Sequence, residues 1–115
     1  LYAAPNRLTR HRVSNLDVGF GEAVRAPGEA PGLLAVESAM DQLAHELGLD
    51  PIELRIRNEP ERDPEHDVPF NGRRMLECYA EGARRLAWSE RSSGPGSRRE
   101  GEHLIGIGMA AAIRM

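Results

Sequence analysis

The residues with the clearest chemical potential lie in a short segment rich in proline and glycine, "VRAPGEAPG", residues 24–32. Arg25 stands in it just before a helical pattern of apolar residues begins. The first N–H groups of a helix have no intrahelical partner and lie at the positive end of its dipole, so they attract anions. A neighbouring guanidinium adds a bidentate grip on phosphate or carboxylate. Arg25 is therefore a candidate anion-binding residue; the alternative is an ion pair with Glu22 or Glu29 that only holds the turn.

The histidines, the single cysteine and an acidic segment are weaker candidates. The four histidines are scattered, without a spacing that brings two of them to one ion, so no metal site is expected. Cys78 has no local base partner and lies beside an apolar stripe, so we expect a small core residue. The acidic segment 59–70 contains three prolines and lacks the regular spacing of a calcium-binding EF-hand loop.

Composition indicates a globular protein and argues against two classes of partner. The 115 residues carry a formal net charge of −3, with 40% hydrophobic and 29% charged residues. An acidic balance argues against a nucleic-acid surface. No apolar run approaches the ~20 residues that cross a bilayer. One cysteine excludes a disulfide within the chain.

Three helices are predicted around these residues. The first carries an apolar stripe at spacings of three and four, with Glu37 among the residues of its polar face and Gly48 just past its end. The stripe consists of Leu33, Val36, Met40, Leu43, Ala44 and Leu47. Asp50 is the expected N-cap of a second helix over residues 51–57, with Pro51 in its first position. A third helix is predicted over 73–87, with Met75, Tyr79, Ala83 and Leu86 on its apolar side.

Extended structure is expected at both ends of the chain. Residues 1–18 favour an edge or surface strand, and residues 103–115 favour a buried strand. A polar linker, 89–102, lies between the third helix and this last strand. The fold class is therefore α+β, with two to three helices packed on strands. Because the strands have few partners, and the chain starts at Leu1 and ends on an apolar stretch, we interpret the sequence as a piece of a larger subunit.

Several stretches resemble the molybdopterin-binding large subunit of the xanthine dehydrogenase and aldehyde oxidase family. The most specific is the run "RAPGEAPG…ESAMD…LGLDP…LRIRNEP", and "LYAAPNR", "PFNGRRMLECYAEGARRLAW" and "GIGMAAAIR" extend it over nearly the whole chain. The resemblance is greatest to the bacterial aldehyde-type branch with separate subunits. It implies that residues 1–115 are part of a molybdopterin-binding domain, with a strand plus helices over 1–88, the linker over 89–102 and the next strand region starting at 103.

The resemblance also implies a function. Family members are oxidoreductases that oxidise aldehydes or hydroxylate N-heterocycles with oxygen derived from water. Their cofactor is molybdopterin with molybdenum, here expected in the cytosine dinucleotide form. Electrons leave through 2Fe-2S clusters to FAD, so an iron–sulfur subunit and an FAD subunit are the expected partners. The expected location is cytoplasmic, with export beside a signal-bearing partner as the alternative.

For the site, the resemblance implies that Arg25 faces the substrate and that the turn of Arg25, Ala26 and Gly28 contacts the cofactor. Pro27 stands where xanthine-type members have an aromatic residue that stacks on the substrate ring, so an aldehyde is favoured over a purine. No residue matches the family's glutamate base, and Glu29 is expected to cap the helix instead. The alternative is a truncated, non-catalytic remnant or an interaction module.

Overall fold

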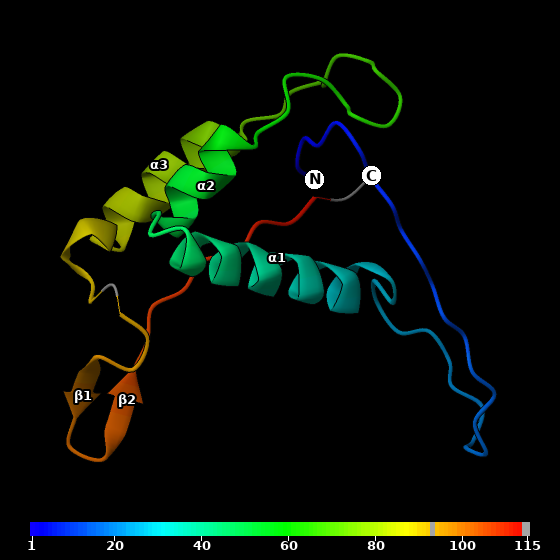
Figure 1. The fold of residues 1–115 in the computed structure, drawn as a ribbon, viewed down its shortest axis with the longest axis horizontal. Coiled ribbons are helices and arrows are strands. Elements are labelled where there is room, and N and C mark those ends of the chain that lie inside the picture. Colours follow the sequence, from blue (N-terminus) through cyan, green and yellow to red (C-terminus); the bar gives the residue numbers. More distant parts are fainter. Residues whose placement is uncertain (93, 114–115) are drawn as a thin grey trace.

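The computed structural model describes residues 1–92 and 94–113. It contains helices α1 (Glu29–Glu46), α2 (Pro51–Arg57) and α3 (Met75–Arg85), a 3-10 turn η1 (Trp88–Glu90), and strands β1 (Arg98–Glu100) and β2 (His103–Ile105). The predicted α+β class is confirmed (Figure 1). None of the described helices is long and apolar enough to span a bilayer.

The end of α1 follows the prediction. Gly48 adopts a φ of +64°, which an L side chain rarely takes. The Leu49 N–H donates to the carbonyl oxygen of Ala44 at 2.9 Å, a Schellman closure that satisfies a free helix carbonyl. The chain therefore reverses here and enters α2 after only four residues.

The start of α2 is also as predicted. Asp50 Oδ1 accepts hydrogen bonds from the N–H groups of Ile52 (2.8 Å) and Glu53 (3.3 Å), and Pro51 occupies the first helical position. These bonds satisfy N–H groups that the helix leaves free, so α2 forms despite having only seven residues. Helix α3 is shorter at each end than the predicted 73–87, because Ala87 leaves the helix with a φ of +50°.

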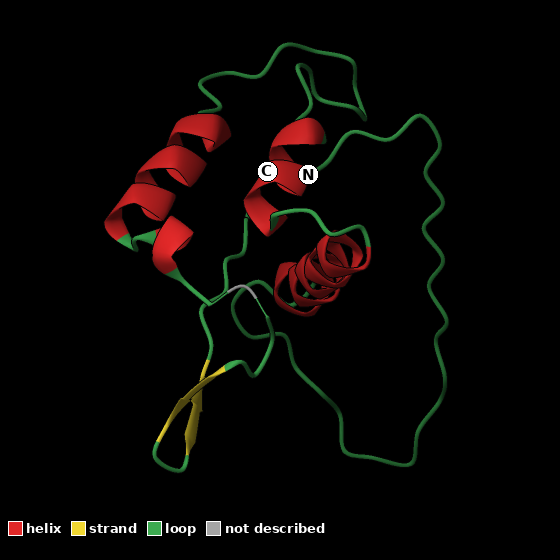
Figure 2. Cartoon of the chain, turned by 60° about the vertical axis from the view of Figure 1, so that its left-hand side comes forward, coloured by secondary structure: helices red, strands yellow, loops and turns green. Residues whose placement is uncertain are grey.

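The strand predicted within residues 1–18 does not form. In the described structure this segment runs along the outside of the molecule (Figures 1 and 2). Its backbone makes two hydrogen bonds to other parts of the described chain: the Ala3 N–H donates to the carbonyl oxygen of Asn58 at 2.9 Å, and the Leu1 carbonyl oxygen accepts from Arg73 Nη2 at 3.1 Å. A strand needs a partner to satisfy its backbone groups, and the described residues offer none here.

Of the strand expected over residues 103–115, the described residues 103–113 form strand only over β2, and residues 114–115 lie outside the described part of the chain. The partner of β2 lies inside the polar linker. β1 and β2 pair antiparallel, with Arg98 opposite Ile105 and Glu100 opposite His103. This hairpin projects from the helices (Figure 2). Two three-residue strands offer too little surface, and α1 packs against α2 instead.

The core is small and is only in part the one that the apolar stripes predicted, because Ala44 and Tyr79 are the buried residues of those stripes. The buried apolar residues are Ala44, Leu54, Tyr79, Trp88 and Ala111. On α1, the stripe residues Val36, Leu43 and Leu47 are 43–56% exposed. Glu37, expected on the polar face, is 5% exposed. The face of α1 that meets α2 and the C-terminal segment is therefore partly ionic.

Candidate functional site

The Arg25 turn leads directly into α1, as predicted. Gly28 is the N-cap residue, and the first backbone bonds run from the Ala30 N–H to the Ala26 carbonyl oxygen (3.0 Å) and from Gly32 to Gly28 (3.1 Å). The N–H groups of Gly28 and Glu29 precede these bonds and so lie at the positive end of the helix dipole. Gly28 has no side chain to cap them, and Glu29, expected to cap the helix, makes no capping hydrogen bond.

The turn has an unusual backbone. Ala26 adopts a φ of +53°, in the left-handed region that residues other than glycine seldom occupy. Such conformations cost of order 1–3 kcal/mol and concentrate at functional sites. This conformation immediately follows Arg25 and fixes the direction in which the chain enters the helix.

An open cavity of about 610 Å³ lies at this turn. One side is formed by the turn and the first residues of α1: Arg25, Ala26, Pro27, Glu29, Ala30 and Leu33. The other lining residues, Ala112 and Ile113, come from the far end of the chain. Of these residues, the sequence singled out Arg25 and Ala26 for the site; Gly28, the third residue singled out, is not among those that line the cavity. Nothing in the local pattern indicated that residues 112–113 would complete it.

Arg25 is exposed, and its guanidinium is not tied to the turn. Among the described residues it forms no ion pair with Glu22 or Glu29, so the purely structural alternative is not what the structure shows. A guanidinium and free backbone N–H groups around one cavity form a set of donors suited to an anion.

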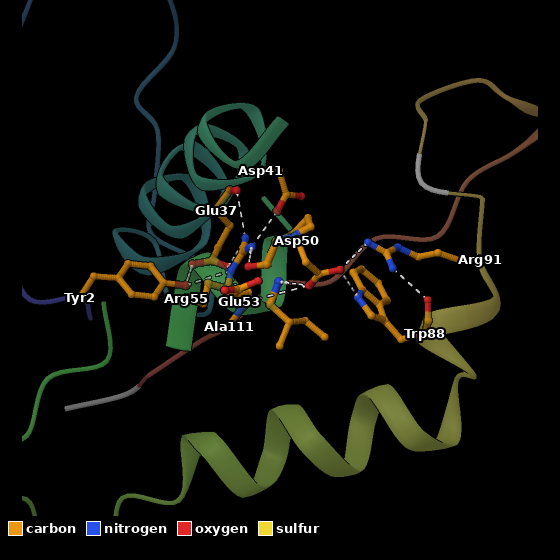
Figure 3. A network of polar contacts seen from close by, with 11 residues as sticks. Tyr2, Glu37, Asp41, Asp50, Glu53, Arg55, Trp88, Arg91 and Ala111 are labelled. Atoms are coloured by element: carbon orange, nitrogen blue, oxygen red, sulfur yellow. Dashed lines mark hydrogen bonds and ion pairs between the residues drawn. The ribbon is translucent and has the colours of Figure 1, made fainter. Parts of the chain in front are cut away.

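A buried ionic network, which sequence reasoning missed, lies further along α1 (Figure 3). Arg55 is fully buried and donates from Nε to Glu37 Oε2 at 3.0 Å and to the Tyr2 hydroxyl at 3.1 Å. Its Nη1 also lies 2.8 Å from Asp41 Oδ1, outside hydrogen-bond geometry. Hydrogen bonds to the carbonyl oxygens of Pro51 (3.0 Å) and Glu37 (3.2 Å) complete its contacts.

Glu37 collects donors from three parts of the chain. Besides Arg55, its Oε1 accepts from the Tyr2 hydroxyl at 2.6 Å, and its Oε2 accepts from the Ala111 N–H at 2.8 Å. Burial, together with the hydrogen bond to Glu37, raises the pKa of the Tyr2 phenol far above its usual value. Tyr2 therefore stays protonated and acts as a donor to this carboxylate.

A second cluster surrounds Asp50. Its Oδ2 accepts from the Trp88 indole N–H and from Arg91, both at 2.8 Å, and the Arg91 guanidinium lies over the indole ring. Burial alone would raise the pKa of Asp50, but the hydrogen bonds from Trp88, Arg91 and the start of α2 hold that pKa below its usual value. The predicted N-cap thus also links α2 to η1.

The remaining candidates do not assemble a reactive centre. Cys78, expected in the core, is exposed, because the buried face of α3 is set by Tyr79. His66 is exposed and pairs with Asp63 at 2.8 Å, and this hydrogen bond raises the pKa of the imidazole. Over residues 1–92 and 94–113, no group of histidine, cysteine, aspartate and glutamate residues could hold a metal ion.

Comparison with known proteins supplies a family. Residues 1–59 match the family described as the molybdopterin cofactor-binding domain. The chain is 47% identical over 115 residues to the aldehyde oxidoreductase molybdenum-binding subunit PaoC of Escherichia coli K12, covering 99% of this chain and 16% of that protein. It is 31% identical over 93 residues to the putative xanthine dehydrogenase molybdenum-binding subunit XdhA of the same strain, covering 76% of this chain and 12% of that protein. The chain thus spans less than a fifth of the length of these relatives.

Proposed function

The chain belongs to the molybdopterin cofactor-binding domain family, and from that premise we propose that it supplies one wall of the molybdenum site in an oxidoreductase that acts on aldehydes. The observation that carries this proposal is the Arg25 turn, where the exposed Arg25 and the first residues of α1 line one cavity at the N-terminal end of the helix. The printed name of the relative PaoC, an aldehyde oxidoreductase subunit, supports the choice of substrate class.

The residues at the cavity fit the anionic part of a molybdopterin. Its phosphate requires donors, and the turn offers the Arg25 guanidinium and the N–H groups of Gly28 and Glu29. A Cβ at Gly28 would meet no atom of the described chain within 4 Å, and its φ of −89° suits any residue. Packing within the described chain therefore does not require glycine there, and a glycine leaves room for a bulky cofactor to approach the backbone.

Among the described residues, no group of three or more histidine, cysteine, aspartate and glutamate side chains could hold a metal ion. When bound, the cofactor supplies the oxidation–reduction chemistry. The role proposed for this chain is to bind the cofactor through Arg25, Ala26 and Gly28 and to place a positive charge beside the substrate. A preorganised cation near the oxygen where negative charge develops lowers the barrier, because it needs no reorganisation during the reaction.

The absence of an aromatic side chain at Pro27 favours an aldehyde over a planar N-heterocycle. We propose further that the cofactor carries a cytosine dinucleotide and that electrons pass to an iron–sulfur subunit and an FAD subunit. A cytoplasmic location is part of the same proposal, and fractionation of cells that express the complete subunit would test it.

The test is substitution of Arg25 in the complete enzyme. Arg25→Ala is expected to reduce aldehyde turnover by about a hundredfold or more, the typical effect of removing one preorganised donor, while molybdenum content stays nearly unchanged. Arg25→Lys should also be impaired, because a point charge does not reproduce the guanidinium fork. Turnover is measured per bound molybdenum, and Arg10→Ala, an exposed arginine of the same N-terminal segment, is the matched control.

Full turnover by both Arg25 variants would refute the substrate-facing role. The non-catalytic alternative, a remnant or an interaction module, is tested by reading the encoding DNA on both sides of this segment. A frame that continues into a subunit of the length of PaoC, and that binds molybdenum, would exclude it.

A further inference from the structure

The cavity at Arg25 is built from two segments, and the second needs to be held in place. Residues 106–113 follow β2 without regular secondary structure and end at Ala112 and Ile113, which line the cavity. Within the described part of the chain, the hydrogen bond from the Ala111 N–H to Glu37 is the one that joins this segment to α1. Ala111 is 5% exposed, so no solvent replaces that contact.

One row of residues on α1 includes both residues that line the cavity and the residue that contacts Ala111. Glu29, Leu33, Glu37 and Asp41 are spaced by four residues and so lie along one side of the helix. Glu29 and Leu33 line the cavity, whereas Glu37 and Asp41 meet Arg55. The carboxylate that holds Ala111 therefore belongs to the residue one turn of helix beyond the cavity-lining Leu33.

The Glu37 carboxylate is itself fixed from several directions. Arg55 contacts Oε2 at 2.9 Å from Nη2, the Tyr2 hydroxyl contacts Oε1, and Arg55 is held by the Pro51 carbonyl oxygen. Such a side chain cannot change rotamer without breaking several buried polar contacts, each costly to leave unmade. The fixed Glu37 carboxylate therefore holds the Ala111 N–H in a nearly fixed position.

We propose that Glu37 is a positioning residue for the active site: by binding the Ala111 N–H it fixes Ala112 and Ile113 against the Arg25 turn and so sets the size of the substrate that the cavity admits. This inference rests on the proposed function of the Arg25 cavity. Glu37 touches neither the cavity nor a substrate and acts only through the backbone at Ala111.

The test uses the complete enzyme with its partner subunits and the variants Glu37→Ala and Glu37→Gln. Alanine removes every contact of the carboxylate, whereas glutamine keeps one oxygen that can still accept from Ala111. Glu53→Gln, which removes an exposed carboxylate paired with Arg57 on α2, is the control. Three quantities are measured: molybdenum and pterin content, amide hydrogen exchange over residues 109–113, and kcat and KM for a short and a bulky aldehyde.

In Glu37→Ala, exchange over 109–113 should be about tenfold faster, as expected when an amide loses its buried acceptor. The ratio of kcat/KM between the short and the bulky aldehyde should shift by about fivefold or more, chiefly through KM, since a wider cavity changes binding before chemistry. Glu37→Gln should shift both quantities in the same direction by less, and Glu53→Gln should shift neither.

Faster exchange over residues 109–113 with an unchanged ratio of kcat/KM between the short and the bulky aldehyde would overturn the proposal. The hydrogen bond between Ala111 and Glu37 would then be purely structural. Unchanged exchange would overturn it as well. If Glu37→Ala does not yield loaded enzyme, Glu37→Gln decides, and failure of both variants to load would assign Glu37 to folding instead. Arg25→Ala, measured alongside, separates the two proposals: full turnover in that variant refutes the function proposed for the cavity, whatever Glu37 does.

Discussion

At the scale of single residues, Arg55 stands out among the described residues as a charged side chain with no exposed surface. Its guanidinium is fully buried, and its partners are Glu37, the partly exposed Asp41 and backbone oxygens. A buried ion pair adds little net stability, because desolvation of both charges offsets their attraction. Removing one partner is different, since the other charge then stays buried and uncompensated.

Arg55→Met is therefore expected to destabilise the fold by about 3–5 kcal/mol. The measurement is the midpoint of thermal unfolding of the complete subunit. Arg57→Met is the control, because Arg57 lies on the same helix and pairs with Glu53 in solvent, where an ion pair contributes roughly 0–1 kcal/mol. Equal shifts in the two variants would contradict the importance assigned to the buried network.

Residue patterns predicted one half of the candidate site. The Arg25 turn was recognisable because its cues are local: proline, glycine and an arginine before a helix. The contact between Glu37 and Ala111 joins positions 74 residues apart, and no local pattern encodes it. Glu37 was also assigned to the polar face, because the stripe rule does not foresee a buried carboxylate that meets a buried arginine.

At the scale of elements, the short helix α2 depends on Asp50. Because hydrogen bonds hold its pKa below the usual value, Asp50 contributes stability that is present above the unfolded-state pKa of about 4. That contribution is lost as pH falls through the lower folded-state pKa. The ionised carboxylate is needed to bind Trp88 and Arg91 together.

Asp50→Asn keeps one oxygen for the N-cap but removes the charge and replaces the oxygen that binds Trp88 and Arg91 with an NH2 donor. We expect the variant to have a lower thermal midpoint than the wild type at pH 6, by the equivalent of about 1–3 kcal/mol for a lost charged hydrogen bond. The difference should shrink as pH falls below about 4. The exposed Asp67, which pairs with Arg62, gives the control Asp67→Asn. A difference that does not change with pH would show that the Asp50 charge contributes no stability.

The helix boundaries predicted from the sequence lie close to those of the structure, because N-caps and C-terminal glycines act within a few residues. The start of α2 at Pro51 and the turn at Gly48 are such cases. The strand expected over residues 1–18 failed for the opposite reason. A strand is completed by a partner elsewhere, and within the described structure the segment has none.

At the scale of the whole molecule, the chain is more open than a self-contained domain. Its accessible surface is 9769 Å², against about 6200 Å² for a folded protein of this mass. Its radius of gyration is 17.3 Å, against about 13 Å for a compact domain of this length. Large side chains such as Phe20 and Val13 are more than 90% exposed. Contacts with the rest of a longer subunit would cover them.

The isolated 115-residue chain is therefore expected to be poorly stable. Calorimetry should show a broad, weak transition, and limited proteolysis should first cut the exposed segment 3–24. The complete subunit, treated identically, is the control and should protect this segment. A sharp cooperative transition from a monomer of the isolated chain would contradict the prediction.

The contact between Glu37 and Ala111 also sets an order of events during synthesis. A ribosome that adds ~5–20 residues per second needs about 4–15 s to travel the 74 residues between them. During that interval α1, α2 and Tyr2 can already assemble around the Glu37 carboxylate. One acceptor position on Glu37 Oε2 then still lacks its donor, the Ala111 N–H. Arrival of Ala111 then brings Ala112 and Ile113 to the Arg25 turn, so this wall of the cavity stays incomplete until residue 113 has been made.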